Sequence, residues 1–158
     1  MSMPVAEFFV NSTIKGLINA ICRVDDDALA AIPLTGPTIM VTNHSTNLEG
    51  PIYYVLLSPR KRTALGKREV WNNLFTRFIM QVWGVIPLQR SGPDRRALRR
   101  ARAALDRGEL LGVAPEGTRS TTGTLQRGRP GAALLATTAD VRIVPVVQWG
   151  IQDVLPNL

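Results

Sequence analysis

The chain has 158 residues, enough for one domain with a single hydrophobic core. Hydrophobic residues make up 45% of it, which excludes a disordered chain, and the single cysteine, Cys22, excludes an internal disulfide and a multi-cysteine metal site. The net charge of +7 comes mostly from arginine, so phosphorylated substrates, acidic lipid headgroups and nucleic acid are all compatible partners. A genomic preference for arginine codons explains part of this excess without any partner.

The N-terminal residues and the lengths of the apolar runs indicate the cellular compartment of the chain. No apolar run approaches the roughly 18–20 residues that span a bilayer. The N-terminus carries an acidic Glu7 and no basic region, so it does not resemble a secretory signal. A lone cysteine fits a reducing compartment, and we expect an intracellular location.

The first third of the chain predicts two helices with a strand between them. Residues 8–24 place apolar side chains at helical spacing, which predicts a helix with one apolar face that packs on the core: Val10, Ile14, Leu17, Ile18 and Ile21. An equally favoured interpretation is that this N-terminal amphipathic helix lies in a bilayer interface with Phe8 and Phe9 inserted. Residues 38–42 predict a short buried strand that ends directly before Asn43 and His44. Pro51 suits the first turn of a helix over 52–57.

The rest of the chain alternates strands and helices. Strands are expected at 63–66, 85–88, 110–113 and 142–148. A helix over 68–82 has a broad apolar face, for which ordinary core packing is favoured over an acyl-chain groove. Asp94 has the chemistry of a helix start and Gly108 that of a helix stop, with Leu98, Ala101 and Leu105 facing inward between them. This alternation predicts an α/β fold, a mixed β-sheet flanked by helices.

His44 is the only histidine, so a mechanism that uses imidazole as a base must use it. Glu49 follows five residues later, a spacing that would separate the two side chains on a continuous helix. Across a strand–loop–helix turn, however, the carboxylate can fold back and orient the imidazole. Such a base could deprotonate an alcohol attacking a thioester, a contribution of roughly 10²–10⁴-fold in rate. An isolated histidine here would more often only hydrogen-bond the backbone, so the neighbouring segments decide.

Four segments, in order, resemble the blocks of the lysophosphatidic acid acyltransferase and glycerol-3-phosphate acyltransferase superfamily. The first is Asn43-His44 with Glu49, a histidine and an acidic residue separated by four positions. The other three are Gly84-Val85-Ile86-Pro87-Leu88-Gln89-Arg90, Pro115-Glu116-Gly117-Thr118-Arg119-Ser120 and Ile143-Val144-Pro145-Val146. Each block alone is a weak or moderate signal, but four in order, over residues 43–146, are a strong one. The resemblance implies a glycerol-3-phosphate acyltransferase-like fold.

The resemblance also implies roles for individual residues. His44 would be the general base and Glu49 its partner, while a second set would form the acceptor site: Arg90, Glu116, Gly117, Thr118 and Arg119. The residue types agree, because arginine presents a planar fork of donors to phosphate and a glycine lets a ligand approach its backbone closely. For an arginine taken alone the usual interpretation is a solvated charge, but the place of Arg90 and Arg119 inside the second and third blocks favours ligand contact. For Glu116 an ion pair that orients Arg119 is equally favoured.

The implied activity is O-acyl transfer from acyl-CoA or acyl carrier protein to a lysophospholipid hydroxyl. The favoured acceptor is 1-acylglycerol 3-phosphate, which would give phosphatidic acid in phospholipid biosynthesis. No cofactor, no metal and no seryl nucleophile are expected, since the chain lacks a Gly-x-Ser-x-Gly segment. Peripheral contact with an anionic membrane is expected at the cytoplasmic face of the cell membrane. Alternatives are another glycolipid or lysophospholipid acceptor, a catalytically silent lipid-binding relative, and a basic nucleic-acid module, which lacks any recognisable motif here.

Two features depart from the family pattern. The acidic residue of the first block is usually aspartate, so Glu49 must place a longer arm against His44. The chain ends at Leu158, soon after the fourth block, where family members continue through further strands and helices. We therefore expect one acyltransferase domain over 1–158, with a helix and linker over 1–35 and a catalytic core over 36–158 that lacks a C-terminal portion. The arginines of 95–102 are expected on a solvated helix face, with anionic headgroups or coenzyme A phosphates as the alternative contact.

Overall fold

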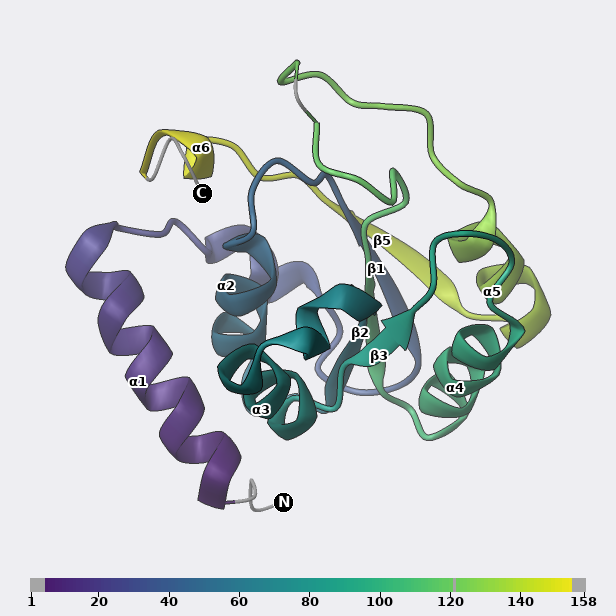
Figure 1. Cartoon of the computed structure of the whole chain (residues 1–158), viewed down its shortest axis with the longest axis horizontal. Coiled ribbons are helices and arrows are strands. Elements are labelled where there is room, and N and C mark those ends of the chain that lie inside the picture. Colours follow the sequence, from purple (N-terminus) through teal and green to yellow (C-terminus); the bar gives the residue numbers. More distant parts are fainter. Residues whose placement is uncertain (1–4, 121, 155–158) are drawn as a thin grey trace.

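The computed structural model describes residues 5–120 and 122–154, arranged as a sheet with helices on both faces (Figure 1). The strands are β1 (Thr38–Thr42), β2 (Arg62–Lys67), β3 (Ile86–Leu88), β4 (Leu110–Val113) and β5 (Arg142–Val146). The helices are α1 (Val5–Ile21), α2 (Glu49–Leu56), α3 (Leu74–Val82), α4 (Arg95–Asp106), α5 (Gly131–Ala139) and α6 (Ile151–Val154), with 3₁₀ turns at Asp27–Ala31 and Arg68–Asn72. Residues 155–158, the end of the expected domain, lie outside the described residues.

The five strands form one sheet in the order β3-β2-β4-β1-β5. The predicted α/β fold with flanking helices is confirmed. Strand direction differs from the expected mixed sheet, because each pairing between the described strands is parallel. The physical reason lies in the connections: a helix follows each of the first four strands and returns the chain to the same end of the sheet. All carboxyl ends therefore meet at one edge.

The core has two layers because side chains alternate along each strand. Ile39 packs with α4 and α5 on one face, whereas the adjacent Met40 packs with Tyr53 of α2 and with Leu57, which directly follows α2, on the other. In Figure 1, α1, α2 and α3 lie to one side of the sheet, and α4 and α5 to the other. Since Ile39 is fully buried, the first strand firmly anchors the segment that follows it and carries His44.

The caps of α4 agree with the sequence prediction. The Asp94 carboxylate accepts a hydrogen bond from the Ala97 backbone N–H at 2.9 Å, and Gly108 follows the helix with φ +77°. Ala101 and Leu105 are buried and Leu98 is partly buried, as expected. The sequence prediction contained no helix over 131–139, where α5 forms after Pro130 and buries Leu135.

The helix expected over 68–82 is interrupted. A 3₁₀ turn ends at Asn72, and Asn73 has extended backbone and caps α3 by accepting hydrogen bonds from the N–H groups of Phe75 and Thr76. The favoured core packing of this segment is wrong for the first turns of α3, because Leu74 and Phe75 are exposed. By accepting these hydrogen bonds, the Asn73 side chain satisfies N–H groups that have no partner at a helix start. A new helix therefore begins after Asn73, and the 3₁₀ turn does not continue into it.

Helix α1 is confirmed, but only part of its apolar face packs on the core. Ile18 is buried as expected, whereas Leu17 and Ile21 are more than half exposed. Two polar contacts explain how the helix is rotated: Asn11 is buried and accepts a hydrogen bond from Trp83 Nε1 at 2.9 Å, and Glu7 pairs with Arg62 at 3.4 Å. Among the described residues, none of the helices combines the length and the hydropathy needed to cross a bilayer.

Candidate active site

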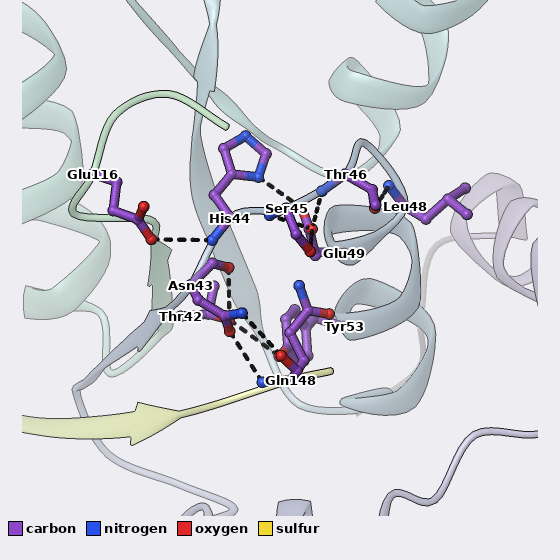
Figure 2. A network of polar contacts seen from close by, with 10 residues as sticks. All are labelled: Thr42, Asn43, His44, Ser45, Thr46, Leu48, Glu49, Tyr53, Glu116 and Gln148. Carbon is purple, nitrogen blue, oxygen red and sulfur yellow. Dashed lines mark hydrogen bonds and ion pairs between the residues drawn. The ribbon is translucent and has the colours of Figure 1, made fainter. Parts of the chain in front are cut away.

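His44 and Glu49 meet at the carboxyl edge of the sheet. His44 lies two residues beyond β1, and Glu49 is the first residue of α2. Their side chains approach to 2.7 Å between His44 Nδ1 and Glu49 Oε2 (Figure 2). The imidazole is 23% exposed, whereas the carboxylate is almost fully buried at 4%. The pair therefore has a shielded acid and a ring that solvent or substrate can reach.

The tight turn between the two residues holds the glutamate arm. Glu49 Oε1 accepts hydrogen bonds from the Ser45 N–H at 2.8 Å, from the Ser45 hydroxyl at 3.0 Å and from the Thr46 N–H. Burial alone would raise the pKa of Glu49, but the hydrogen bond from His44 and those from the Thr46 and Ser45 backbone lower it below its ordinary value. A carboxylate at the first turn of α2 is also favoured by the helix dipole.

These contacts fix which imidazole nitrogen is free to react. An ionised carboxylate only accepts hydrogen bonds, so Nδ1 of His44 must carry the hydrogen that faces Glu49. The lone pair then resides on Nε2, on the opposite side of the ring. A base with this tautomer is ready to take a proton from a hydroxyl group that lies within hydrogen-bond distance of Nε2.

The backbone of His44 is tied to the third block. Glu116 is buried; its Oε1 accepts from the His44 N–H at 3.3 Å and its Oε2 from the Gln126 N–H at 3.1 Å. The Ser120 N–H donates to the His44 carbonyl at 2.7 Å. Because both of its oxygens accept from backbone groups, Glu116 positions the histidine segment. Its expected ligand contact and its ion pair with Arg119 stay predictions.

Asn43 ties the same segment to the chain beyond β5. Its side-chain Nδ2 donates to the Gln148 carbonyl at 2.9 Å, and its Oδ1 accepts from the Gln148 N–H at 3.0 Å. Figure 2 shows this pair of contacts beneath His44. Hydrogen bonds to the backbone thus connect the first block with the third block and with the residues that follow the fourth, which keeps the histidine in place at the sheet edge.

A cavity of about 170 Å³ opens beside the pair, between α2 and the sheet. His44, Glu49, Arg90 and Gly117 line it at the carboxyl edge. Most of its remaining wall is apolar and comes from β1, α2, β2 and β4, and includes Met40, Tyr53, Tyr54, Leu57, Leu65, Leu110 and Val113. The cavity therefore joins a polar mouth at the histidine to an apolar interior.

Two residues at the polar mouth have features that suit a ligand. Arg90 follows β3, and its Nε atom is buried with no hydrogen-bond partner among the described residues. A buried donor of this kind calls for an acceptor. Gly117 has φ +68°, a left-handed conformation that disfavours other residues, and a Cβ there would meet the Arg129 side chain at 3.0 Å. Close packing by Arg129 is thus one reason for glycine here.

The structure brings together four of the seven predicted site residues in one cavity, with Glu116 directly behind His44. Thr118 and Arg119 are exposed and do not belong to the cavity wall. The sequence prediction did not include Ser45 and Thr46, although Thr46 followed three residues later by Glu49 is the pattern of a capping box. Among the described residues, no cluster of three histidine, cysteine or acidic side chains could hold a metal ion.

The fold and this site define an α/β protein with a carboxylate-held histidine beside an apolar cavity. A model of the Acyltransferase family matches residues 23–149, and the chain belongs to that family. Over 138 residues it is 28% identical to the 1-acyl-sn-glycerol-3-phosphate acyltransferase LPAT1 of Arabidopsis thaliana chloroplasts, covering 85% of this chain and 38% of the relative. The chloroplast 1-acyl-sn-glycerol-3-phosphate acyltransferase BAT2 of Brassica napus is also 28% identical over 138 residues, with 85% and 40% covered.

The fold is also similar to a solved structure. The LPA acyltransferase PlsC of Thermotoga maritima superposes with a TM-score of 0.71 over 91% of this chain and 58% of that one, at 22% identity. At that identity the likeness establishes the fold. The chain spans well under half the length of the plant relatives and somewhat more than half of the Thermotoga chain.

Proposed function

We propose that this protein transfers an acyl group from a thioester to the hydroxyl of a lysophospholipid, with 1-acylglycerol 3-phosphate as the favoured acceptor. The observation that carries the proposal is the 2.7 Å contact between His44 and Glu49 at the mouth of an apolar cavity. Family membership and the activity for which the plant relatives are named support it. The place in phospholipid biosynthesis is part of the same proposal.

The geometry supports a direct transfer without a covalent enzyme intermediate. Nε2 of His44 takes the proton of the acceptor hydroxyl as its oxygen attacks the thioester carbonyl. The new C–O bond gives a tetrahedral oxyanion, which collapses by breaking the C–S bond. The departing thiolate then takes the proton back from His44, so the base is restored. Glu49, held by Ser45 and Thr46, stabilises the imidazolium between the two proton transfers.

The apolar interior of the cavity provides a place for the acyl chain. Side chains such as Met40, Leu57 and Leu110 are each buried and surround the space between α2 and the sheet. Burying a hydrocarbon chain against such walls is favourable by about 0.8 kcal/mol for each CH₂ group. The thioester carbonyl would then lie near His44, with its carrier, coenzyme A or acyl carrier protein, outside the cavity.

Arg90 is the residue of this cavity best placed for the acceptor phosphate. Replacing Arg90 with alanine is expected to raise the KM for lysophosphatidic acid about tenfold or more with a smaller change in kcat, because a charged hydrogen bond to phosphate is lost. Arg119→Ala, outside the cavity wall, is expected to raise KM less. Steady-state acyl transfer with radiolabelled acyl-CoA measures both, and Arg99→Ala, an exposed arginine of α4, controls for lost charge. An unchanged KM in Arg90→Ala would remove its role.

Peripheral contact with an anionic membrane is supported by the exposed apolar side chains of α1 and α3. They are Val5, Phe8, Phe9, Leu17 and Ile21 on α1, and Leu74, Phe75 and Phe78 on α3. The two helices lie on the same side of the sheet (Figure 1). Basic side chains such as Lys15 and Arg77 belong to the same helices. Apolar insertion combined with basic flanks is the pattern of an interfacial helix, and it supports a location at the cytoplasmic face of the cell membrane.

The membrane contact has its own test. Replacing Phe75 and Phe78 together with serine is expected to lower partitioning onto phosphatidylglycerol vesicles by about tenfold or more, since two phenyl rings no longer enter the apolar layer. Leu125→Ser is the control, because this leucine is 75% exposed on a loop far from α3 in the sequence. Vesicle flotation gives the bound fraction. Equal binding by the wild type and the double variant would exclude α3 from the contact.

A further inference from the structure

A second and larger cavity, of about 680 Å³, lies at the edge of the sheet opposite His44. It is bordered by the segments that lead into β2, β3 and β4 and by the last turns of α4. Trp71, Met80 and Trp83 form apolar parts of its wall. The proposed acyl transfer leaves this cavity without a role, because the reacting groups gather at the carboxyl ends of the strands.

The cavity has an excess of positive charge. Five basic side chains line it, Arg60, Lys61, Arg62, Arg100 and Arg107, against two acidic ones, Glu7 and Glu109. Both acidic side chains are already paired, Glu7 with Arg62 at 3.4 Å and Glu109 with Arg107 at 2.8 Å. Within the described part of the chain, the other three cations have no carboxylate within salt-bridge distance. Three positive charges at this cavity therefore lack a counter-ion.

The positive charge of Arg60 is buried, which makes it energetically unfavourable without an anion nearby. The residue is only 8% exposed, and its Nη2 donates to two neutral acceptors, the Gly36 carbonyl at 2.7 Å and the Thr38 hydroxyl at 3.2 Å. Its Nε and Nη1 are buried and have no hydrogen-bond partner among the described residues. Burial lowers the pKa of the Arg60 guanidinium. A buried cation without an anion is unfavourable, so a negative charge in the adjacent cavity would stabilise it through space.

We infer that this cavity binds a phosphate-bearing anion, with Lys61 and Arg100 in contact with it and Arg60 supplying positive charge from the wall. Lys61 and Arg100 are exposed, so both can reach a ligand, whereas the Arg60 side chain is fixed. Phosphate is the group that suits several converging cationic donors best. The phosphate can belong to a lipid headgroup or to a soluble molecule. Arg62 and Thr63 line both cavities, so β2 separates this ligand from the acyl cavity.

The test is calorimetric titration of the full chain with inorganic pyrophosphate. Three double variants carry the same loss of charge. They are Lys61→Ala with Arg100→Ala in the basic cavity, Arg90→Ala with Arg119→Ala at the acyl-transfer site, and Arg99→Ala with Arg142→Ala as the control, since both control residues are exposed and line neither cavity. Removing the two cavity contacts is expected to weaken a saturable binding event about tenfold or more, while the control pair changes it less than about twofold. His44→Ala is expected to bind as wild type does, so failure of the catalytic proposal would leave this one standing.

A parallel titration with phosphatidic acid vesicles distinguishes the two sources of phosphate. Loss of vesicle binding in the cavity pair but not in the control pair, with no pyrophosphate binding, identifies a lipid headgroup as the ligand. Saturable pyrophosphate binding that the cavity pair loses identifies a soluble phosphate. The inference is overturned if pyrophosphate and vesicles bind the cavity pair as tightly as wild type. Equal losses in the cavity and control pairs, or a loss only in the Arg90 and Arg119 pair, also overturn it.

Discussion

Replacing His44 with alanine is expected to lower kcat for acyl transfer by roughly 10²–10⁴-fold, the usual contribution of a positioned general base. No other imidazole can take over, because His44 is the only histidine in the sequence and its Nε2 is the free nitrogen of the pair with Glu49. The assay follows radiolabelled acyl groups from acyl-CoA to lysophosphatidic acid. Full retained activity in His44→Ala would overturn the mechanism.

Two controls separate lost chemistry from a damaged fold. In His44→Asn the amide can still donate to Glu49 but cannot titrate as a base, so it is expected to lose as much activity as His44→Ala while melting closer to wild type. Added imidazole is expected to restore part of the activity of His44→Ala, since a free base can enter the vacated space. Ser45 and Thr46 bond Glu49 independently of His44, so these contacts are expected to hold the turn in each variant.

Strands and caps were predictable because local rules decide them. The bounds of β1 and β4 match the prediction. Each is a short apolar run bounded by residues that favour turns, and such a run is typical of a buried strand. Asp94 and Gly108 bound α4 where their chemistry requires it. Helix α5 was missed because a run of glycine, alanine, leucine and threonine has no polar stripe that would reveal a helical period.

Long-range contacts could not be predicted in this way. The rotation of α1 depends on Asn11 and Trp83, which lie 72 residues apart, and no local pattern relates them. The sequence predicted that Glu49 orients His44, but it did not show how a glutamate side chain, longer than the usual aspartate, would fit against the imidazole. The turn through Ser45 and Thr46 answers that question, because it directs one carboxylate oxygen to the imidazole and the other to the backbone.

Exchanging Glu49 for glutamine is expected to lower kcat by roughly 10²–10⁴-fold, close to the loss of the base itself. The amide has one oxygen and one NH₂ group in place of two acceptors. One of the two present contacts, to His44 Nδ1 or to the Ser45 and Thr46 N–H groups, must therefore meet a donor. The charge that stabilises the imidazolium is lost as well. Acyl transfer at saturating acyl-CoA measures kcat for wild type and variant.

Glu49→Asp is the matched control, since it keeps the charge and shortens the arm by one methylene. It is expected to retain partial activity, because aspartate is the usual residue at this place in the family but the turn here is set for glutamate. Equal activity of Glu49→Gln and Glu49→Asp would exclude a role for the charge, and unchanged kcat in Glu49→Gln would exclude the orienting contact. The size of the gap between the two variants measures how much of the effect is electrostatic.

The same pair predicts how stability depends on pH. Because the folded state lowers the pKa of Glu49 below its ordinary value of 4.5, the ionised carboxylate stabilises the fold above pH 4.5. That contribution is lost as the pH falls through the lower pKa of the folded state. Glu49→Gln has no such proton to bind, so urea unfolding should show wild type more stable near neutral pH and the difference shrinking in acid. If the difference in unfolding free energy between wild type and Glu49→Gln stayed constant below pH 4.5, the ionised carboxylate would gain nothing from His44 and the turn. His44 would then lack the partner that holds its tautomer.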